Sequence, residues 1–178
     1  MIAISGGHYP AKRGASDGAG FSEYPETMLW AKTIVDAINI TNPGMAVLVP
    51  TGTLGEKVRF INRLEGVKIA AEIHFNAAPT NRPVRGSETL YCPGSKTGKY
   101  IAEKVQDTLG SLLPPSRGIK EGWYQMDPSK GIDYFLKATK CPAVILEPEF
   151  VVNKEAILLF RVPVCKSLAR IFVRLVLH

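Results

Sequence analysis

The stretch Ala143-Val-Ile-Leu-Glu147 is the most informative segment for the fold. Four apolar residues, two of them β-branched, precede a single carboxylate, and Pro142 stands directly before them. A continuous apolar run of this kind is typical of a strand buried on both faces, and such strands belong to sheets covered by helices on both sides. The run therefore predicts an inner strand of an α/β protein.

Around this run, the rest of the chain alternates between strand and helix patterns. We predict strands at 1–8, 46–50, 67–74, 87–92, 118–124 and 143–147, and helices at 25–40, 54–66, 96–113, 134–139 and 157–177. The segment 76–85 is polar and proline-rich and is predicted as a loop. Helices between apolar strands predict one α/β domain over residues 1–178, with about six strands in a twisted, mostly parallel or mixed sheet.

Composition and charge exclude several classes of protein. Hydrophobic residues make up 46% and charged residues 21% of the chain, as in an ordinary globular domain. The net charge of +6 attracts polyanions, but the chain has no dense Lys/Arg run with interleaved aromatics, so we predict no nucleic-acid partner. No apolar run reaches the roughly 20 residues that span a bilayer, so we predict no integral membrane segment. The basic 157–177 helix is predicted to lie on the domain, with a membrane-surface role as the alternative.

Two histidines stand at the ends of predicted strands, His8 after the first and His74 after the third. Imidazole is the commonest metal ligand, and α/β folds place their chemistry at strand ends. The pair therefore suggests a metal site that needs a third ligand. Glu23 precedes the 25–40 helix and can turn inward, whereas Glu26 falls in its first turn and is the alternative ligand.

Three further carboxylates are candidates for the chemistry. Glu147 ends the most apolar strand, where desolvation raises the pKa of a carboxyl and suits it to accept a proton. Glu149 lies two residues on and is a weaker candidate for the same role. Glu72 lies two residues before His74, either as a hydrogen-bond partner behind that histidine or as a surface ion pair.

Several short motifs in series carry a family resemblance. They are Ser5-Gly-Gly-His8 with Gly14-Ala15 and Glu23, Glu72-Ile-His74-Phe-Asn76-Ala77, and Pro142-Ala-Val-Ile-Leu-Glu147-Pro-Glu-Phe150-Val-Val-Asn153, with Gly86 to Tyr91 and Arg117 to Lys120 between them. Together they resemble the zinc-dependent N-acetylmuramoyl-L-alanine amidases of bacterial cell separation and of phage or prophage lysins. The resemblance implies that His8, Glu23 and His74 bind Zn²⁺ and that Glu147 is the catalytic acid and base.

The resemblance also implies the substrate, bacterial peptidoglycan. The bond cleaved is the amide between the lactyl group of N-acetylmuramic acid and the L-alanine of the stem peptide. We predict substrate contacts from Asn76, Glu72, Lys120 and Glu149. A zinc peptidase that cuts within the stem peptide and a catalytically silent wall-binding module are the alternatives. Nucleotide or phosphate binding is a third, disfavoured alternative, because the loop at Gly6-Gly7 lacks Gly-x-Gly-x-x-Gly and the loop at 51–57 lacks the Gly-Lys-Ser/Thr ending.

The cellular setting is predicted from the cysteines and the N-terminus. Cys92, Cys141 and Cys165 form no CxxC pair and are predicted as thiols in a reducing compartment. The chain begins directly with a strand and shows no secretory signal. We therefore predict a bacteriolytic endolysin-type enzyme, monomeric, that stays in the cytoplasm until it is released and acts in the periplasm or the wall.

Overall fold

A computed structural model gives the fold of residues 1–77 and 84–178. The part of the predicted loop at 78–83 lies outside the described residues. The strands are β1 (Ile2–Gly6), β2 (Ala46–Leu48), β3 (Ile69–Ile73), β4 (Ser87–Tyr91), β5 (Ser116–Glu121) and β6 (Ala143–Glu147). The α-helices are α1 (Glu23–Thr41), α2 (Leu54–Arg63), α3 (Lys96–Leu112), α4 (Tyr134–Ala138) and α5 (Lys154–Leu177), and two 3₁₀ turns, η1 (Tyr124–Met126) and η2 (Pro128–Lys130), follow β5.

All six described strands form one mixed sheet in the order β2-β1-β3-β6-β4-β5. The four strands β2, β1, β3 and β6 are parallel to one another. β4 runs antiparallel to β6, and β5 runs parallel to β4. The predicted α/β domain with a mixed sheet flanked by helices is confirmed, and β6, which carries the 143–147 run, lies inside the sheet.

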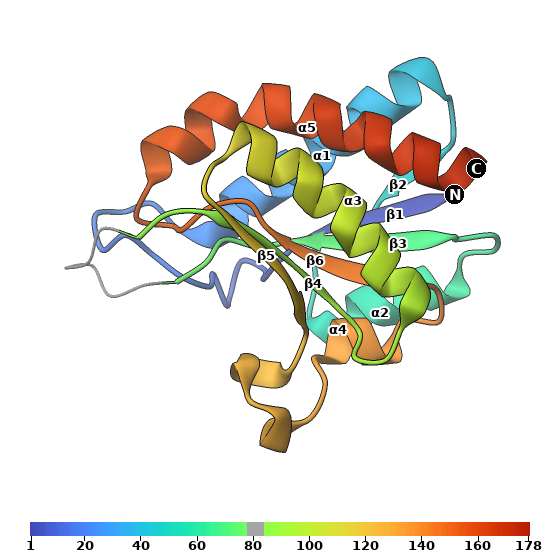
Figure 1. Cartoon of the computed structure of the whole chain (residues 1–178), viewed down its shortest axis with the longest axis horizontal. Helices are drawn as coiled ribbons and strands as arrows, with labels where there is room; N and C mark the ends of the chain where they lie inside the picture. Colours follow the sequence, from blue (N-terminus) through green and yellow to red (C-terminus); the bar gives the residue numbers. More distant parts are fainter. Residues whose placement is uncertain (78–83) are drawn as a thin grey trace.

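Helices cover both faces of the sheet (Figure 1). α1, α3 and α5 lie on one face, and α2 and α4 lie on the other. The alternation within β1 follows this arrangement, because Ile2 and Ile4 belong to the core under α1 and α5, while Ala3 belongs to the core on the α2 side. Parallel strands end at the same edge of a sheet, so the residues after β1, β3 and β6 come together there.

Two predicted boundaries need correction. α1 begins at Glu23 rather than at Pro25, because Ser22 is still extended (φ −139°) and the proline fits within the first helical turn, where backbone N–H groups have no intrahelical partner. Glu23 is therefore the first helical residue and does not lie in the preceding loop. β5 begins earlier than predicted, at Ser116, because this residue pairs with Ser87 directly after α3 ends.

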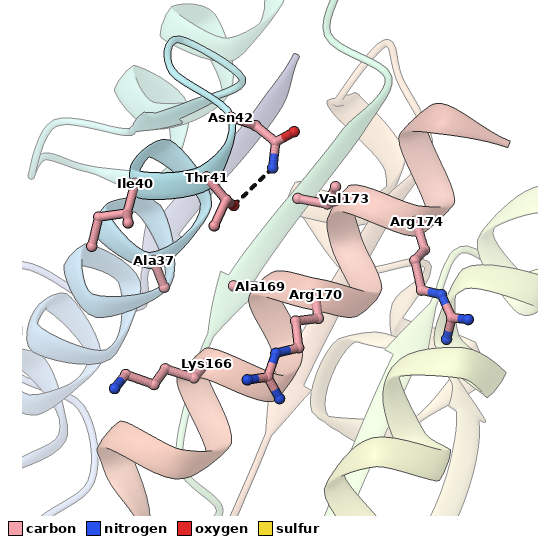
Figure 2. A pocket seen from close by; sticks show the side chains of 9 residues that line it. All are labelled: Ala37, Ile40, Thr41, Asn42, Lys166, Ala169, Arg170, Val173 and Arg174. Carbon is pink, nitrogen blue, oxygen red and sulfur yellow. Dashed lines mark hydrogen bonds between the residues drawn. The ribbon is translucent and has the colours of Figure 1, made fainter.

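The long helix α5 packs on α1 and α3 and leaves a basic hollow beside α1. This hollow has a volume of about 660 Å³, and Figure 2 shows Lys166, Arg170 and Arg174 along its α5 side. Its walls also include Ala37 and Ile40 of α1. None of the residues predicted for the chemistry lines this hollow. No described helix combines the length and the apolarity needed to cross a membrane.

Candidate active site

The structure brings His8, Glu23 and His74 together at the strand-end edge of the sheet. His8 follows β1, His74 follows β3, and Glu23 opens α1. Nε2 of His8 lies 3.0 Å from Oε2 of Glu23, and Nδ1 of His74 lies 2.8 Å from Oε1 of the same carboxylate. Possible ligand atoms of the three side chains all lie within 4.8 Å of one another. This is the group predicted from the sequence.

Glu23 is held firmly between the two histidines. Its side chain is buried, and its two oxygens also accept backbone N–H groups from Ala15 at 2.9 Å and Phe75 at 3.0 Å. Burial by itself would raise the pKa of Glu23, but the hydrogen bonds and charges of His74 and His8 outweigh it and hold that pKa far below its usual range. The carboxylate is therefore ionised and fixed in position.

The loop after β1 makes room for this group with a glycine and an unusual backbone. A Cβ atom on Gly14 would collide with Cδ2 of His8 and would lie 2.5 Å from Oε2 of Glu23. Gly14 also has a φ of +75°, which favours glycine. His8 itself has a φ of 61°, a conformation that non-glycine residues adopt mainly where the surroundings enforce it. The loop is thus shaped around the two imidazoles.

Gly14→Ala is expected to displace His8 from Glu23 and to abolish metal binding at this group. Gly18→Ala is the matched control, because Gly18 has the same φ of +75° and no atom lies within 4 Å of the place that a Cβ would take. In both variants, alanine in a left-handed backbone costs about 1 kcal/mol of stability. Thermal melts measure this loss of stability separately from any loss of metal binding. Calorimetric titration with Zn²⁺ checks the prediction, and equal metal affinity in the two variants would contradict it.

Behind His74 lies a buried polar network. Oε2 of Glu72 is 3.2 Å from Nε2 of His74, and its Oε1 accepts hydrogen bonds from Ser5 (3.1 Å) and Lys57 (3.2 Å). Glu72 is 2% exposed and Lys57 is 3% exposed, so neither forms a surface ion pair. Burial lowers the pKa of His74, but its contacts with Glu23 and Glu72 raise it well above the usual value. Glu72 therefore orients His74, and its predicted substrate contact is not supported by this placement.

Two other predicted residues lie away from the group. The alternative ligand Glu26 is turned toward α5, where its Oε1 accepts a hydrogen bond from Arg161 at 2.6 Å. Glu149 is fully buried, and its Oε1 accepts N–H groups from Gly86, Phe150 and Asn153. The strand ends at Glu147, so the alternation that would have put Glu149 beside it does not continue. Glu149 ties the chain after β6 to Gly86, the residue directly before β4.

Glu147 ends β6 next to His74, and the two residues line one pocket of about 190 Å³. Burial is the main cause that raises the pKa of Glu147 to about 7. Across the sheet it pairs with Glu88 of β4, whose carboxylate accepts hydrogen bonds from Lys120 and Arg117. Burial raises the pKa of Glu88, but these two cations outweigh it and lower that pKa. A carboxyl with a pKa near neutrality can both take up and release a proton in the working pH range.

The remaining predicted contacts, Asn76 and Lys120, lie near this edge. Asn76 is half-buried, and its backbone bonds to Glu149 and Val151 beside β6. Lys120 is half-buried on β5 and bonds to Glu88.

Sequence reasoning did not identify Lys57 as the partner of Glu72, although a lysine beside the apolar residues Val58 and Ile61 of a helix is a signal of a buried ion pair. It also missed the segment after β5 that faces Glu147. The signal in the sequence for this segment is the aromatic pair Trp123-Tyr124, which stands between a strand and a helix.

Two imidazoles and a carboxylate that could hold a metal ion, with a separate carboxyl of raised pKa nearby, are typical of the site of a hydrolase on an α/β fold. The family model of the N-acetylmuramoyl-L-alanine amidases matches residues 2–167. The chain belongs to this family and is a peptidoglycan hydrolase that acts on an amide bond. A search of curated protein sequences gives no match.

Several solved structures share this fold. The amidase AmiC2 of Nostoc punctiforme superposes with a TM-score of 0.82 at 20% identity, covering 100% of this chain and 98% of that one. The catalytic domain of the amidase CwlV from Bacillus (Paenibacillus) polymyxa gives a TM-score of 0.80 at 21% identity, covering 97% and 96%. The catalytic domain of the CD27L endolysin, which targets Clostridia difficile, gives 0.70 at 26% identity, covering 99% and 96%.

Proposed function

We propose that this chain cleaves the amide between the lactyl group of N-acetylmuramic acid and L-alanine by means of a zinc ion held by His8, Glu23 and His74. The observation that carries the proposal is the convergence of two imidazoles on one buried carboxylate, with Glu147 in the adjoining pocket. The network from Lys57 through Glu72 to His74 supports it, because metal-binding histidines commonly donate their second N–H to a carboxylate.

The donor set suits zinc. Zinc is bound by imidazole nitrogen and carboxylate oxygen, and hydrolytic sites use three protein ligands so that a fourth position stays open for water. Gly14 keeps a side chain out of the space beside His8 and Glu23, and Gly7 does the same beside His74. The ionised carboxylate of Glu23 adds the negative charge that a divalent cation requires.

The chain's own residues then carry the proton transfers. When bound, zinc supplies a water of lowered pKa and polarises the lactyl carbonyl. Glu147 accepts the proton of the attacking water and afterwards delivers it to the departing amine of L-alanine. Its pKa of about 7 matches both tasks. Glu72 keeps the ring of His74 oriented, which leaves Nδ1 directed toward the ligand group.

Digestion of purified peptidoglycan followed by mass analysis of the new termini tests the function. We expect stem peptides with a free L-alanine amine and glycan strands that keep the lactyl carboxylate, and we expect both to disappear after treatment with a chelator. New termini within the stem peptide would establish the peptidase alternative instead. Binding to the wall without any product would establish the silent module.

Glu72→Gln is expected to weaken zinc binding about 10- to 100-fold, the usual effect of losing a carboxylate partner behind a metal-binding histidine. Glu65→Gln, on an exposed acid after α2, is the matched control. Competition with a chromogenic chelator measures both affinities. An unchanged affinity in Glu72→Gln would show that His74 needs no such partner.

We also propose that the protein is a monomeric, bacteriolytic enzyme of the endolysin kind that acts in the periplasm or the wall. The likeness to the CD27L endolysin domain supports this setting, as does the net charge of +6, which favours anionic wall polymers. Clearing of a suspension of permeabilised bacteria by the added protein tests the lytic role. Sedimentation analysis tests the oligomeric state.

A further inference from the structure

Residues 122–133, between β5 and α4, form a long loop that leaves the sheet and returns to it, the excursion. It leaves the sheet at Gly122, forms η1 and η2, and returns at Asp133, whose N–H bonds to the carbonyl of Gly122 at 2.9 Å. Trp123 and Ile132 pair across its base. In Figure 1 this excursion projects from the sheet on the side of α4. The family chemistry already described assigns it no role.

One wall of the pocket beside Glu147 is built by this excursion. His74 and Glu147 line the pocket of about 190 Å³ from the sheet, with Leu90 and Ile145. The excursion contributes Trp123, Tyr124, Gln125, Met126 and Asp133. A substrate whose reacting bond lies at Glu147 must therefore place a neighbouring group against an aromatic surface.

The backbone of the excursion holds the side chains of Tyr124 and Met126 in exposed positions. Gln125 and Met126 both have a left-handed backbone, with φ of 53° and 57°. The turn is closed by bonds from the N–H of Tyr124 to Gly131 at 2.8 Å and from the N–H of Met126 to Trp123 at 2.9 Å. Tyr124 remains 50% exposed and Met126 remains 49% exposed. Large side chains kept exposed by an unfavourable backbone indicate a prepared contact surface.

Charge and shape select the part of the substrate that fits. Two acidic residues, Glu147 and Asp133, are among those that line the pocket, which disfavours the carboxylates of a stem peptide. A saccharide ring is neutral and has an apolar C–H face that packs on aromatic rings such as those of Trp123 and Tyr124. The muramic acid ring is joined to the scissile amide through the lactyl group and therefore lies close to the reacting bond.

We propose that Trp123, Tyr124 and Met126 form the saccharide subsite of this enzyme, packing on the muramic acid ring next to Glu147. The subsite rests on the proposed function, since it assumes cleavage at the lactyl amide. Trp123 is the central element, because it stands at the base of the excursion and lines the pocket together with His74 and Glu147.

The chain offers a direct optical test. It has two tryptophans, and Trp30 is fully buried against Phe75, so changes in tryptophan emission on ligand binding report on Trp123. The probes are N-acetylmuramoyl-L-alanyl-D-isoglutamine and the dipeptide L-alanyl-D-isoglutamine, added to the zinc-loaded Glu147→Gln variant. We expect the sugar-bearing probe to shift the emission and the dipeptide to leave it unchanged.

Kinetics on soluble muropeptides give the second measurement. Trp123→Ala is expected to raise KM about tenfold with little change in kcat. A tenfold change is the effect expected from the loss of one aromatic packing contact. Trp123→Phe should restore most of the loss. Tyr100→Ala, on an exposed tyrosine of α3 outside this pocket, is the control and should leave KM and kcat unchanged. Melting curves show whether each variant is folded.

The outcomes are distinguishable. Equal emission changes with both probes, or binding of the sugar-bearing probe without any emission change, would overturn the saccharide subsite while leaving the amidase activity intact. If the wild type releases no stem peptides from peptidoglycan, the proposed function fails, whatever the emission shows. If Trp123→Ala does not fold, the probe comparison on the Glu147→Gln variant decides alone.

Discussion

Glu147→Gln is expected to lower kcat about 10²- to 10⁴-fold, the usual contribution of a positioned acid and base, while one zinc ion per chain remains bound. The glutamine keeps the size of the side chain but can neither take the proton of water nor give one to the leaving amine. Metal analysis checks that zinc remains bound, and turnover of muropeptides by the same preparation checks that kcat falls. Glu121→Gln, an exposed acid at the end of β5, is the control and should be fully active.

The pH dependence of the wild type follows from the same residue. Burial raises the pKa of Glu147 to about 7, so below that pH the carboxyl is protonated and cannot act as a base. Activity should therefore rise with pH as Glu147 ionises. A bound cation favours the ionised form, so the midpoint should lie at or below 7 in the zinc enzyme. A profile that falls with pH through this range would exclude Glu147 as the base.

Glu23→Gln is expected to abolish stoichiometric zinc binding, a larger effect than the roughly 100-fold loss seen when a partner behind a ligand is removed. The amide cannot supply the charge that joins His8 and His74, and its NH₂ group must face one of two backbone N–H groups that now bond to carboxylate oxygen. Metal content after dialysis and activity on peptidoglycan are the measurements.

Glu26→Gln is the comparison that makes this result decisive. Glu26 lies one helical turn further along α1 and pairs with Arg161, so its loss should cost about 1–3 kcal/mol of stability and leave zinc binding unchanged. If Glu26→Gln lost the metal and Glu23→Gln kept it, the ligand assignment would be reversed.

The apolar runs were sufficient to predict the fold class, and the short motifs were sufficient to predict the group around His8, Glu23 and His74. Strand direction was not predictable, because the alternation in Ser87–Tyr91 is the same whether β4 lies parallel or antiparallel to β6. Glu149 was misplaced because spacing by two residues holds only while the strand continues, and β6 ends at Glu147.

The wall formed by Trp123 and Tyr124 could not be predicted for a different reason. Its position depends on how an excursion of the chain folds back over the end of β6, and the aromatic pair in the sequence does not specify which residues that excursion contacts. The same holds for Lys57, whose partner Glu72 is 15 residues away in the sequence. Sequence motifs identify the chemically active residues at the strand ends. The residues that support them are identified only from the packing of the helices and strands in the structure.

The pairing of Glu23 with both histidines has a consequence for how the proposed zinc ion would bind. The carboxylate already holds the two imidazoles within 3.0 Å, and Ala15 and Phe75 hold the carboxylate, so the loop needs no rearrangement to receive an ion. An incoming cation instead competes with protons, because the contacts that raise the pKa of His74 keep it protonated. If zinc binds as proposed, acid is therefore expected to release the ion by protonating His74, and the same protein is expected to bind zinc again at neutral pH.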